Sequence, residues 1–214
     1  MDEDLTIINT NSRNEKIKNF LKRNIKNLIL ISVILILVLS SFFYYKSYKE
    51  GQKELIANKY ISTVIDHKNG NKSKTISKMK EIIEQRDETY SPLALYFLID
   101  KKLIENNNSI NSLFDILINK TSLENEVKNL VIYKKALFNA DFVDENELLN
   151  ILNPLINSES VWKSHALYLV AEYFYSKNEK QKSKEFFNEI IVLENSNKDL
   201  RLEALKRINR DLSD

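Results

Sequence analysis

The side chains that most often perform chemistry in enzymes are sparse in this chain of 214 residues. His67 and His165 are its only histidines, and the chain contains no cysteine to accompany either of them. Thiolate catalysis, disulfides and cysteine-based zinc sites are therefore excluded. The two isolated glycines, Gly51 and Gly70, also exclude a glycine-rich phosphate loop. We expect a protein that is not an enzyme, with no cofactor, no metal and no small-molecule substrate.

The charged residues likewise lack the pattern of a catalytic or nucleic-acid-binding site. Neighbouring acids such as Asp144 and Glu145 are interpreted as solvated helix ends, where the helix dipole alone favours them. The formal net charge is +2, and basic residues alternate with acidic ones along the chain. A nucleic-acid-binding protein would instead concentrate its basic residues in a patch or stripe. No nucleic-acid partner is expected.

Tyrosines and acids recur at similar places in successive helical segments, and they suggest recognition of a polypeptide. Tyrosine rings provide contact area at low entropic cost, and their hydroxyls can bond a main chain. We hypothesise a peptide- or partner-binding groove lined by Tyr96, Asp100, Tyr133, His165, Tyr168, Glu172 and Tyr175. The alternative interpretation is that these tyrosines are half-buried structural residues.

Long helices joined by polar turns must position these side chains. Glycine and proline occur only twice each, too few for the tight turns of a β-rich fold. Apolar residues recur at helical spacing beyond residue 46. This periodicity predicts helices at 47–66, 73–86, 91–106, 109–119, 123–139, 144–156, 160–176, 179–193 and 198–211, with caps at Ser91, Ser160 and Asn178.

These helices are expected to form repeated pairs. Comparable helix starts fall near 90, 124 and 160, at intervals of about 34 and 36 residues, which is typical of helix-turn-helix solenoids. The segment 165–197 aligns without gaps to a tetratricopeptide repeat, although Ile190 and Asn195 depart from its consensus. In that alignment small residues let the two helices approach, and large ones fill the seam between pairs. The predicted packing residues are Leu167, Val170, Ala171, Phe174, Ser183 and Phe187.

The predicted fold class is therefore all-α: one transmembrane helix, then a tetratricopeptide-like α-solenoid of helix pairs with a C-terminal capping helix. A generic helical bundle is the alternative.

The segment Leu28–Tyr45 reads LILISVILILVLSSFFYY and carries no charge. At 1.5 Å per residue, this stretch and its edge approach the ~30 Å hydrocarbon core of a bilayer. Core helices of soluble proteins rarely continue so long without a polar position. A cleaved signal peptide would have a shorter apolar region that ends in small residues, whereas this one ends in bulky aromatics. We predict an uncleaved signal anchor in contact with the lipid bilayer.

The flanking charges predict the orientation of this anchor. The basic residues before it are Arg13, Lys16, Lys18, Lys22, Arg23 and Lys26. Fewer basic residues follow it closely, so the positive-inside rule favours a cytoplasmic N-terminus. We expect a short basic cytoplasmic tail at 1–26, a transmembrane signal anchor at 27–45 and an exported helical domain at 46–214.

A basic tail, one anchor ending in aromatics and a divergent tetratricopeptide domain together resemble the YfgM-like family. The resemblance covers nearly the whole chain and rests on this architecture and on the repeat at 165–197. It implies a single-pass protein of the bacterial inner membrane with a periplasmic domain. The implied partners are the Sec translocon and membrane-anchored periplasmic chaperones. Two alternatives stay open: a scaffold for an envelope-assembly complex, and a membrane-tethered regulator.

Overall fold

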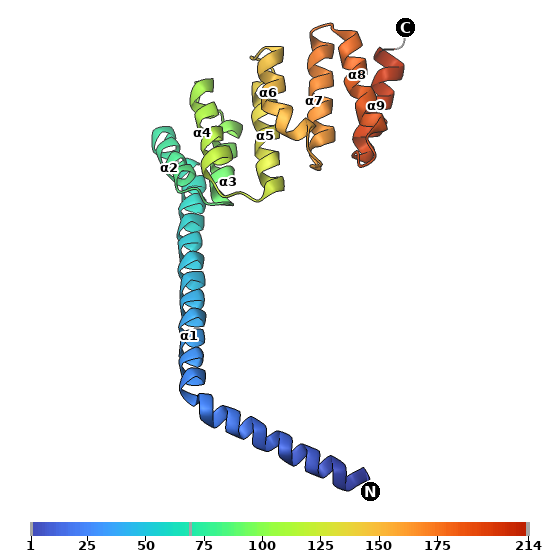
Figure 1. Ribbon diagram of the computed structural model, residues 1–214. Helices are drawn as coiled ribbons and strands as arrows, with labels where there is room; N and C mark the ends of the chain where they lie inside the picture. Colours follow the sequence, from blue (N-terminus) through green and yellow to red (C-terminus); the bar gives the residue numbers. More distant parts are fainter. Residues whose placement is uncertain (1, 69, 213–214) are drawn as a thin grey trace. The chain divides into compact units, whose positions relative to one another are not determined.

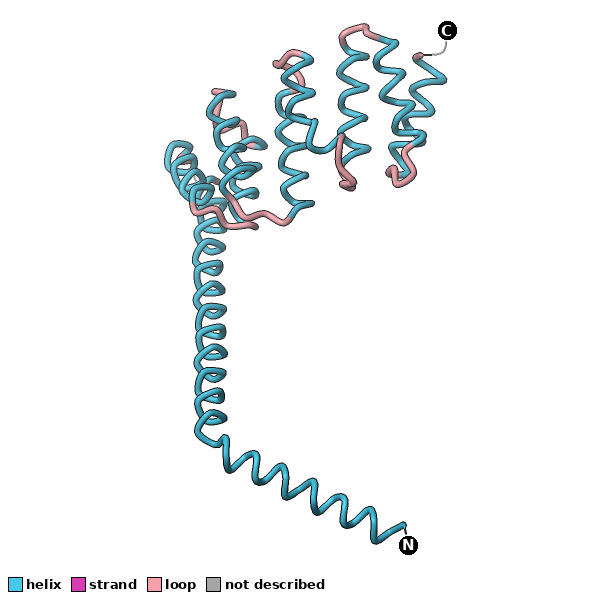
Figure 2. The backbone as a smooth tube through the Cα atoms, in the orientation of Figure 1, coloured by secondary structure: helices cyan, strands magenta, loops and turns pink. Residues whose placement is uncertain are grey.

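The computed structural model describes residues 2–68 and 70–212, with side chains described from residue 15 onward except for residues 17 and 69. Over these residues it contains nine α-helices and no strand (Figures 1 and 2). The helices are α1 Asp2–His67, α2 Lys72–Glu84, α3 Tyr90–Asp100, α4 Asn107–Lys120, α5 Asn125–Asn139, α6 Glu145–Ile156, α7 Lys163–Ser176, α8 Lys180–Val192 and α9 Lys198–Asp211. The chain divides into two compact units, Met1–Leu55 and Ile56–Asp214.

The first unit is the N-terminal part of α1, and it contains the apolar segment. This is the one helix among the described residues that is long and apolar enough to cross a membrane. Side chains such as Leu30, Ile36 and Phe43 are mostly exposed, whereas a core helix would bury them. The helix predicted at 47–66 is not separate, because α1 continues unbroken to His67 with only Gly51 to weaken it.

The second unit is a solenoid in which each helix packs mainly against its neighbours in the chain (Figure 1). Taken in chain order from α3, the successive pairs are α3 and α4, α5 and α6, and α7 and α8. The helix α3 packs more extensively on α2 than on α4, and α9 packs on the last pair. A stack with contacts only between nearby elements is the defining feature of a solenoid. The predicted all-helical class, an apolar helix followed by a helical solenoid, is confirmed.

The core of the solenoid consists of three apolar clusters that follow one another along the stack. Met79, Leu98 and Phe114 belong to the first cluster, which the end of α1 also covers through residues such as Tyr60. Leu152 belongs to the second, and Phe187 to the third. Each cluster is built from the inward stripes of adjacent helices, so no helix buries its apolar face alone.

Three helix ends are closed by residues other than glycine in the left-handed conformation. Arg86, Lys102 and Asn178 have φ of 57°, 48° and 62°. After α3, Lys102 N donates to Ile99 O and Leu103 N donates to Leu98 O, at 3.0 and 2.9 Å. This pattern is a Schellman motif, and it stops α3 at Asp100 rather than near the predicted residue 106.

Two of the three predicted caps have other roles. Ser91 is buried, and its Oγ donates to Ile82 O of α2 at 2.8 Å. Asn178 closes the end of α7 instead of starting α8. Ser160 does act at a helix start, because its Oγ accepts from Trp162 N at 3.1 Å.

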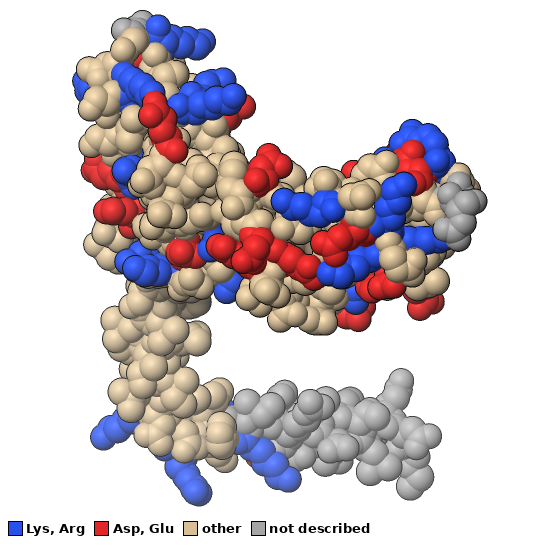
Figure 3. Space-filling view, turned by 90° about the horizontal axis from the view of Figure 1, so that it is seen from above, with Lys and Arg blue, Asp and Glu red and all other residues tan. Residues whose placement is uncertain are grey.

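Figure 3 shows basic and acidic side chains intermixed over the visible face of the solenoid. Several of these charges join adjacent helices. Lys135 Nζ of α5 bonds Asp115 Oδ1 of α4 at 2.8 Å, and Lys182 Nζ of α8 bonds Glu145 Oε2 of α6 at 2.9 Å. Because at least one partner in each pair is substantially exposed, these contacts set the register of the stack more than they stabilise it.

Substitution Lys102→Gly is expected to stabilise the solenoid by about 0.5–1 kcal/mol. Glycine adopts the left-handed conformation without the steric cost that a Cβ imposes there. Urea unfolding of the detergent-solubilised chain, followed by the fluorescence of its single tryptophan, measures the change. Lys101→Gly is the matched control, because Lys101 has φ of −83° and gains nothing from glycine. Equal effects of the two substitutions would contradict the strain at Lys102.

Candidate functional site

The seven residues of the predicted groove all lie on the first helices of the three pairs. Tyr96 and Asp100 belong to α3, Tyr133 to α5, and the other four to α7. The structure gathers them into three clusters. Each cluster lies at a seam, which here means the region between one of these first helices and the next odd-numbered helix: α3–α5, α5–α7 and α7–α9. Each cluster also includes side chains that the sequence analysis did not select.

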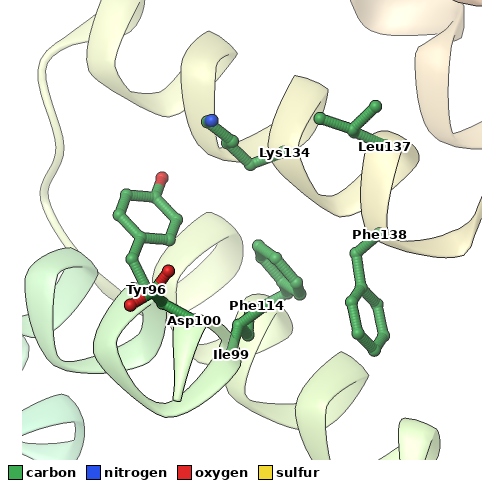
Figure 4. Close-up of a pocket in the computed structure, with 7 residues that line it drawn as sticks. All are labelled: Tyr96, Ile99, Asp100, Phe114, Lys134, Leu137 and Phe138. Carbon is green, nitrogen blue, oxygen red and sulfur yellow. The ribbon is translucent and has the colours of Figure 1, made fainter. Parts of the chain in front are cut away.

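The α3–α5 seam contains a pocket of about 440 Å³ (Figure 4). Its lining comes from Tyr96, Ile99 and Asp100 of α3, Phe114 of α4, and Lys134, Leu137 and Phe138 of α5. Figure 4 shows the hydroxyl of Tyr96, the carboxylate of Asp100 and the amino group of Lys134 toward one end, with Leu137 and Phe138 toward the other. The pocket is therefore amphipathic.

The polar end of the pocket contains groups that are only partly satisfied. The hydroxyl of Tyr96 is buried and has no hydrogen-bond partner among the described residues. Burial raises the pKa of Tyr96 to about 12, so the hydroxyl stays neutral and can donate. A buried polar group without a partner costs about 1–3 kcal/mol. A ligand that accepts from this hydroxyl would recover part of that cost.

Asp100 and Lys134 place both charges beside that hydroxyl. Asp100 Oδ2 pairs with Lys101 Nζ at 2.8 Å, and the hydrogen bond and charge of Lys101 hold the pKa of Asp100 below its usual value. Asp100 is thus a carboxylate near neutral pH. Lys134 is exposed and has no ion-pair partner among the residues with described side chains. The polar end therefore offers two donors and one acceptor.

The α5–α7 seam is filled by the protein's own aromatic residues. The ring of Tyr133 stacks on Trp162 at 5.7 Å, and His165 approaches both rings, at 5.8 and 5.0 Å. Trp162 Nε1 donates to Glu126 O at 3.1 Å, and Ser160 Oγ donates to Glu126 Oε2 at 2.8 Å. These contacts join the starts of α5 and α7.

The α7–α9 seam is closed by Arg207 of α9. Its guanidinium donates to both carboxylate oxygens of Glu172, at 2.8 and 2.9 Å, and lies 4.3 Å from the ring centre of Tyr175. It also pairs with Asp211. Burial, followed by the charges of Glu172 and Glu203, raises the pKa of Tyr168 to about 12. Three of the predicted groove residues are thus engaged within the chain.

The six predicted packing residues are all buried. Leu167, Ala171 and Phe187 belong to the third core cluster, which α9 completes. Val170 and Phe174 belong to the second cluster, with residues of α5 and α6. Ser183 is fully buried where α8 lies against α7. Small side chains at Ala171 and Ser183 leave room for the two helices to approach.

The contacts that the sequence analysis missed connect residues about one repeat apart. The bonds Ser160–Glu126, Arg207–Glu172 and Trp162–Glu126 span 34, 35 and 36 residues. This spacing equals the predicted period, so pairing complementary side chains at that interval could have identified Glu126 and Arg207. No such signal identifies Lys134 or Phe138, which join the pocket only through tertiary packing.

The chain is similar to the ancillary SecYEG translocon subunit of Buchnera aphidicola subsp. Acyrthosiphon pisum (strain APS). The two are 26% identical over 205 residues, which cover 89% of this chain and 99% of that protein. A match of this extent includes residues of both units. No protein-family model matches the chain, and no solved structure matches it.

The free energy of unfolding of the solenoid is expected to fall as the pH drops below about 6.5. Burial lowers the pKa of His165 below its ordinary value of 6.5, an effect that the carbonyl of Val161 partly offsets. The unfolded chain therefore binds the proton first, and stability declines until the pH passes below the native pKa.

Urea unfolding followed by circular dichroism at several pH values measures this decline. Trp162 fluorescence is unsuitable here, because a protonated His165 only 5.0 Å away would quench it. His165→Gln is expected to lack this part of the pH dependence. An unchanged slope in that variant would show that another group is responsible.

Proposed function

We propose that this chain is a membrane-anchored interaction subunit of the Sec translocon, without catalytic activity of its own. In this proposal the solenoid lies in the periplasm and assists exported proteins, together with membrane-anchored periplasmic chaperones. The observation that carries the proposal is the similarity, across both units, to a protein named as an ancillary SecYEG translocon subunit.

The anchor is proposed to be residues 27–45, which cross the bacterial inner membrane once. Their support is the exposed apolar side chains of α1, which a bilayer would cover. Exposed Lys22 and Lys26 precede this segment and favour a cytoplasmic location for residues 1–26. Residues 46–214 then form the periplasmic domain.

The chemistry of the solenoid supports a binding role. Among the described residues, no group of three or more His, Asp or Glu side chains could hold a metal ion. The tyrosine-containing seams instead present aromatic and apolar surfaces, of the kind that proteins use to contact one another. The tetratricopeptide-like nature of the stack is part of the proposal, supported by its helix pairs and their period.

Affinity purification of the tagged chain from membranes solubilised in mild detergent is expected to recover translocon subunits, which mass spectrometry would identify. The control is the same anchor joined to an unrelated soluble domain, which separates recruitment by the solenoid from recruitment by the anchor. Recovery of only an envelope-assembly complex would contradict the proposal and favour a scaffold.

The proposed orientation predicts which sites a membrane-impermeant maleimide can reach in intact cells with a permeabilised outer membrane. The chain lacks cysteine, so single substitutions report without background. Asn195→Cys, at an exposed position in the loop before α9, is expected to react before lysis. Ser12→Cys, in the basic tail, is expected to react only after lysis. The reverse pattern would overturn the orientation while leaving the anchor in place.

A further inference from the structure

The seam between α3 and α5 differs from the two seams that follow it. Trp162 and His165 cover Tyr133 at the second seam, and Arg207 lies over Tyr175 at the third. At the first seam no described ring or guanidinium packs on Tyr96, and its hydroxyl has no partner. The first seam thus contains a pocket that no aromatic ring or guanidinium of the described residues fills at Tyr96.

We propose that this pocket binds a bulky apolar side chain, together with its adjoining main chain, in an unfolded segment of an exported polypeptide. The inference rests on the proposed function and specifies what the solenoid would recognise. It assigns a separate contribution to each end of the pocket.

The apolar end suits one large side chain. Phe114 and Phe138 form its wall, with ring centres 6.1 Å apart, and Phe142 continues this aromatic surface at 5.5 Å from Phe138. Phe142 is 56% exposed and Leu137 is 46% exposed, so apolar surface remains uncovered at the rim. The volume of about 440 Å³ lies at the small end of the range for ligand pockets.

The polar end suits an unpaired main chain. A free peptide group has a carbonyl, which can accept from Tyr96 or Lys134, and an N–H, which can donate to Asp100. In folded proteins these groups are already paired within helices and sheets, so the pocket favours chains that are not yet folded. Lys134 is an exposed and flexible side chain, so it can move to admit such a chain to the hydroxyl of Tyr96.

The same arrangement disfavours a fatty acid, which is the other amphipathic ligand of suitable size. A fatty acid has a carboxylate that can accept from Tyr96 and Lys134, but it has no N–H to donate to Asp100, and its negative charge would lie near that of Asp100. A peptide group is neutral, and it offers a carbonyl to the donors Tyr96 and Lys134 and an N–H to the acceptor Asp100. The mixed polarity of this end therefore favours the polypeptide.

Fluorescence anisotropy with the full chain in lipid nanodiscs tests the proposal. The probe is a fluorescein-labelled unstructured peptide of Gly, Ser and Thr with one central Phe, and the matched probe has Ser in place of that Phe. Leu137→Glu places a charge at the rim of the pocket, and Tyr96→Phe removes only the hydroxyl. Leu93→Glu is the control variant, because Leu93 is 40% exposed on the same helix as Tyr96 and does not line the pocket.

The Phe peptide is expected to bind about tenfold more tightly than the Ser peptide, because burial of one apolar side chain contributes at least that much. Leu137→Glu should abolish this preference. Tyr96→Phe should weaken binding a few-fold, and Leu93→Glu should leave it unchanged. Equal binding of the two peptides, equal effects of the two Glu variants, or displacement of the Phe peptide by dodecanoate would overturn the proposal.

Recovery of translocon subunits by the same variants separates the two proposals. Loss of peptide preference in Leu137→Glu with unchanged recovery would support both. Absence of any peptide preference in the unmodified chain, with translocon subunits still recovered, would overturn the pocket proposal alone.

Discussion

The solenoid depends on the packing of each helix against the helices next to it in the chain, both within a pair and between successive pairs. A helix pair buries only one side of its apolar surface internally, so the other side must be covered by the next pair. At the last two seams the cover includes Trp162, which donates to the main-chain oxygen of Glu126, and Arg207, which binds the carboxylate of Glu172. The helices are thereby held in register over the length of the stack. Among the described residues, the first seam combines apolar walls with the unpartnered hydroxyl of Tyr96.

The positions of the helices can be predicted from the sequence, because the apolar stripe of a helix is visible within a few turns of chain. The residue at which α3 ends could not be predicted in this way. Lys102 adopts a left-handed conformation that residues with a Cβ rarely take, and nothing in its identity indicates this. In other proteins the left-handed residue that closes a helix is usually glycine. This chain has only two glycines, and Arg86, Lys102 and Asn178 take that position. Asparagine tolerates this conformation, but nothing in the propensities of Arg86 and Lys102 indicates it.

The sequence predicted the residues of the candidate site only where they lie on the same helix. Tyr96 and Asp100 are one helical turn apart, so both reach the same pocket, as their spacing indicates. The partners from α5 depend on how α5 is placed against α3 and α4, which a single sequence does not specify. Tyr168 and Tyr175 match the same periodic pattern, but α9 brings Arg207 against Glu172 and Tyr175. Spacing thus identified which helices face the seams, and packing determined which seam stays open.

The anchor and the pocket make physical sense together. Burying one apolar side chain contributes about 1.5–3 kcal/mol, less than the ~4 kcal/mol that a millimolar dissociation constant requires, so the main-chain contacts at the polar end must supply the rest. A freely diffusing protein with such a pocket would capture few chains. A membrane tether beside a translocon raises the effective concentration of the pocket toward millimolar, where weak contacts are repeatedly made. Weak binding also lets the chain leave again as it folds, because folding pairs the main-chain groups that the pocket recognises. Under the proposed function, the anchor is therefore what makes a weak and reversible pocket sufficient.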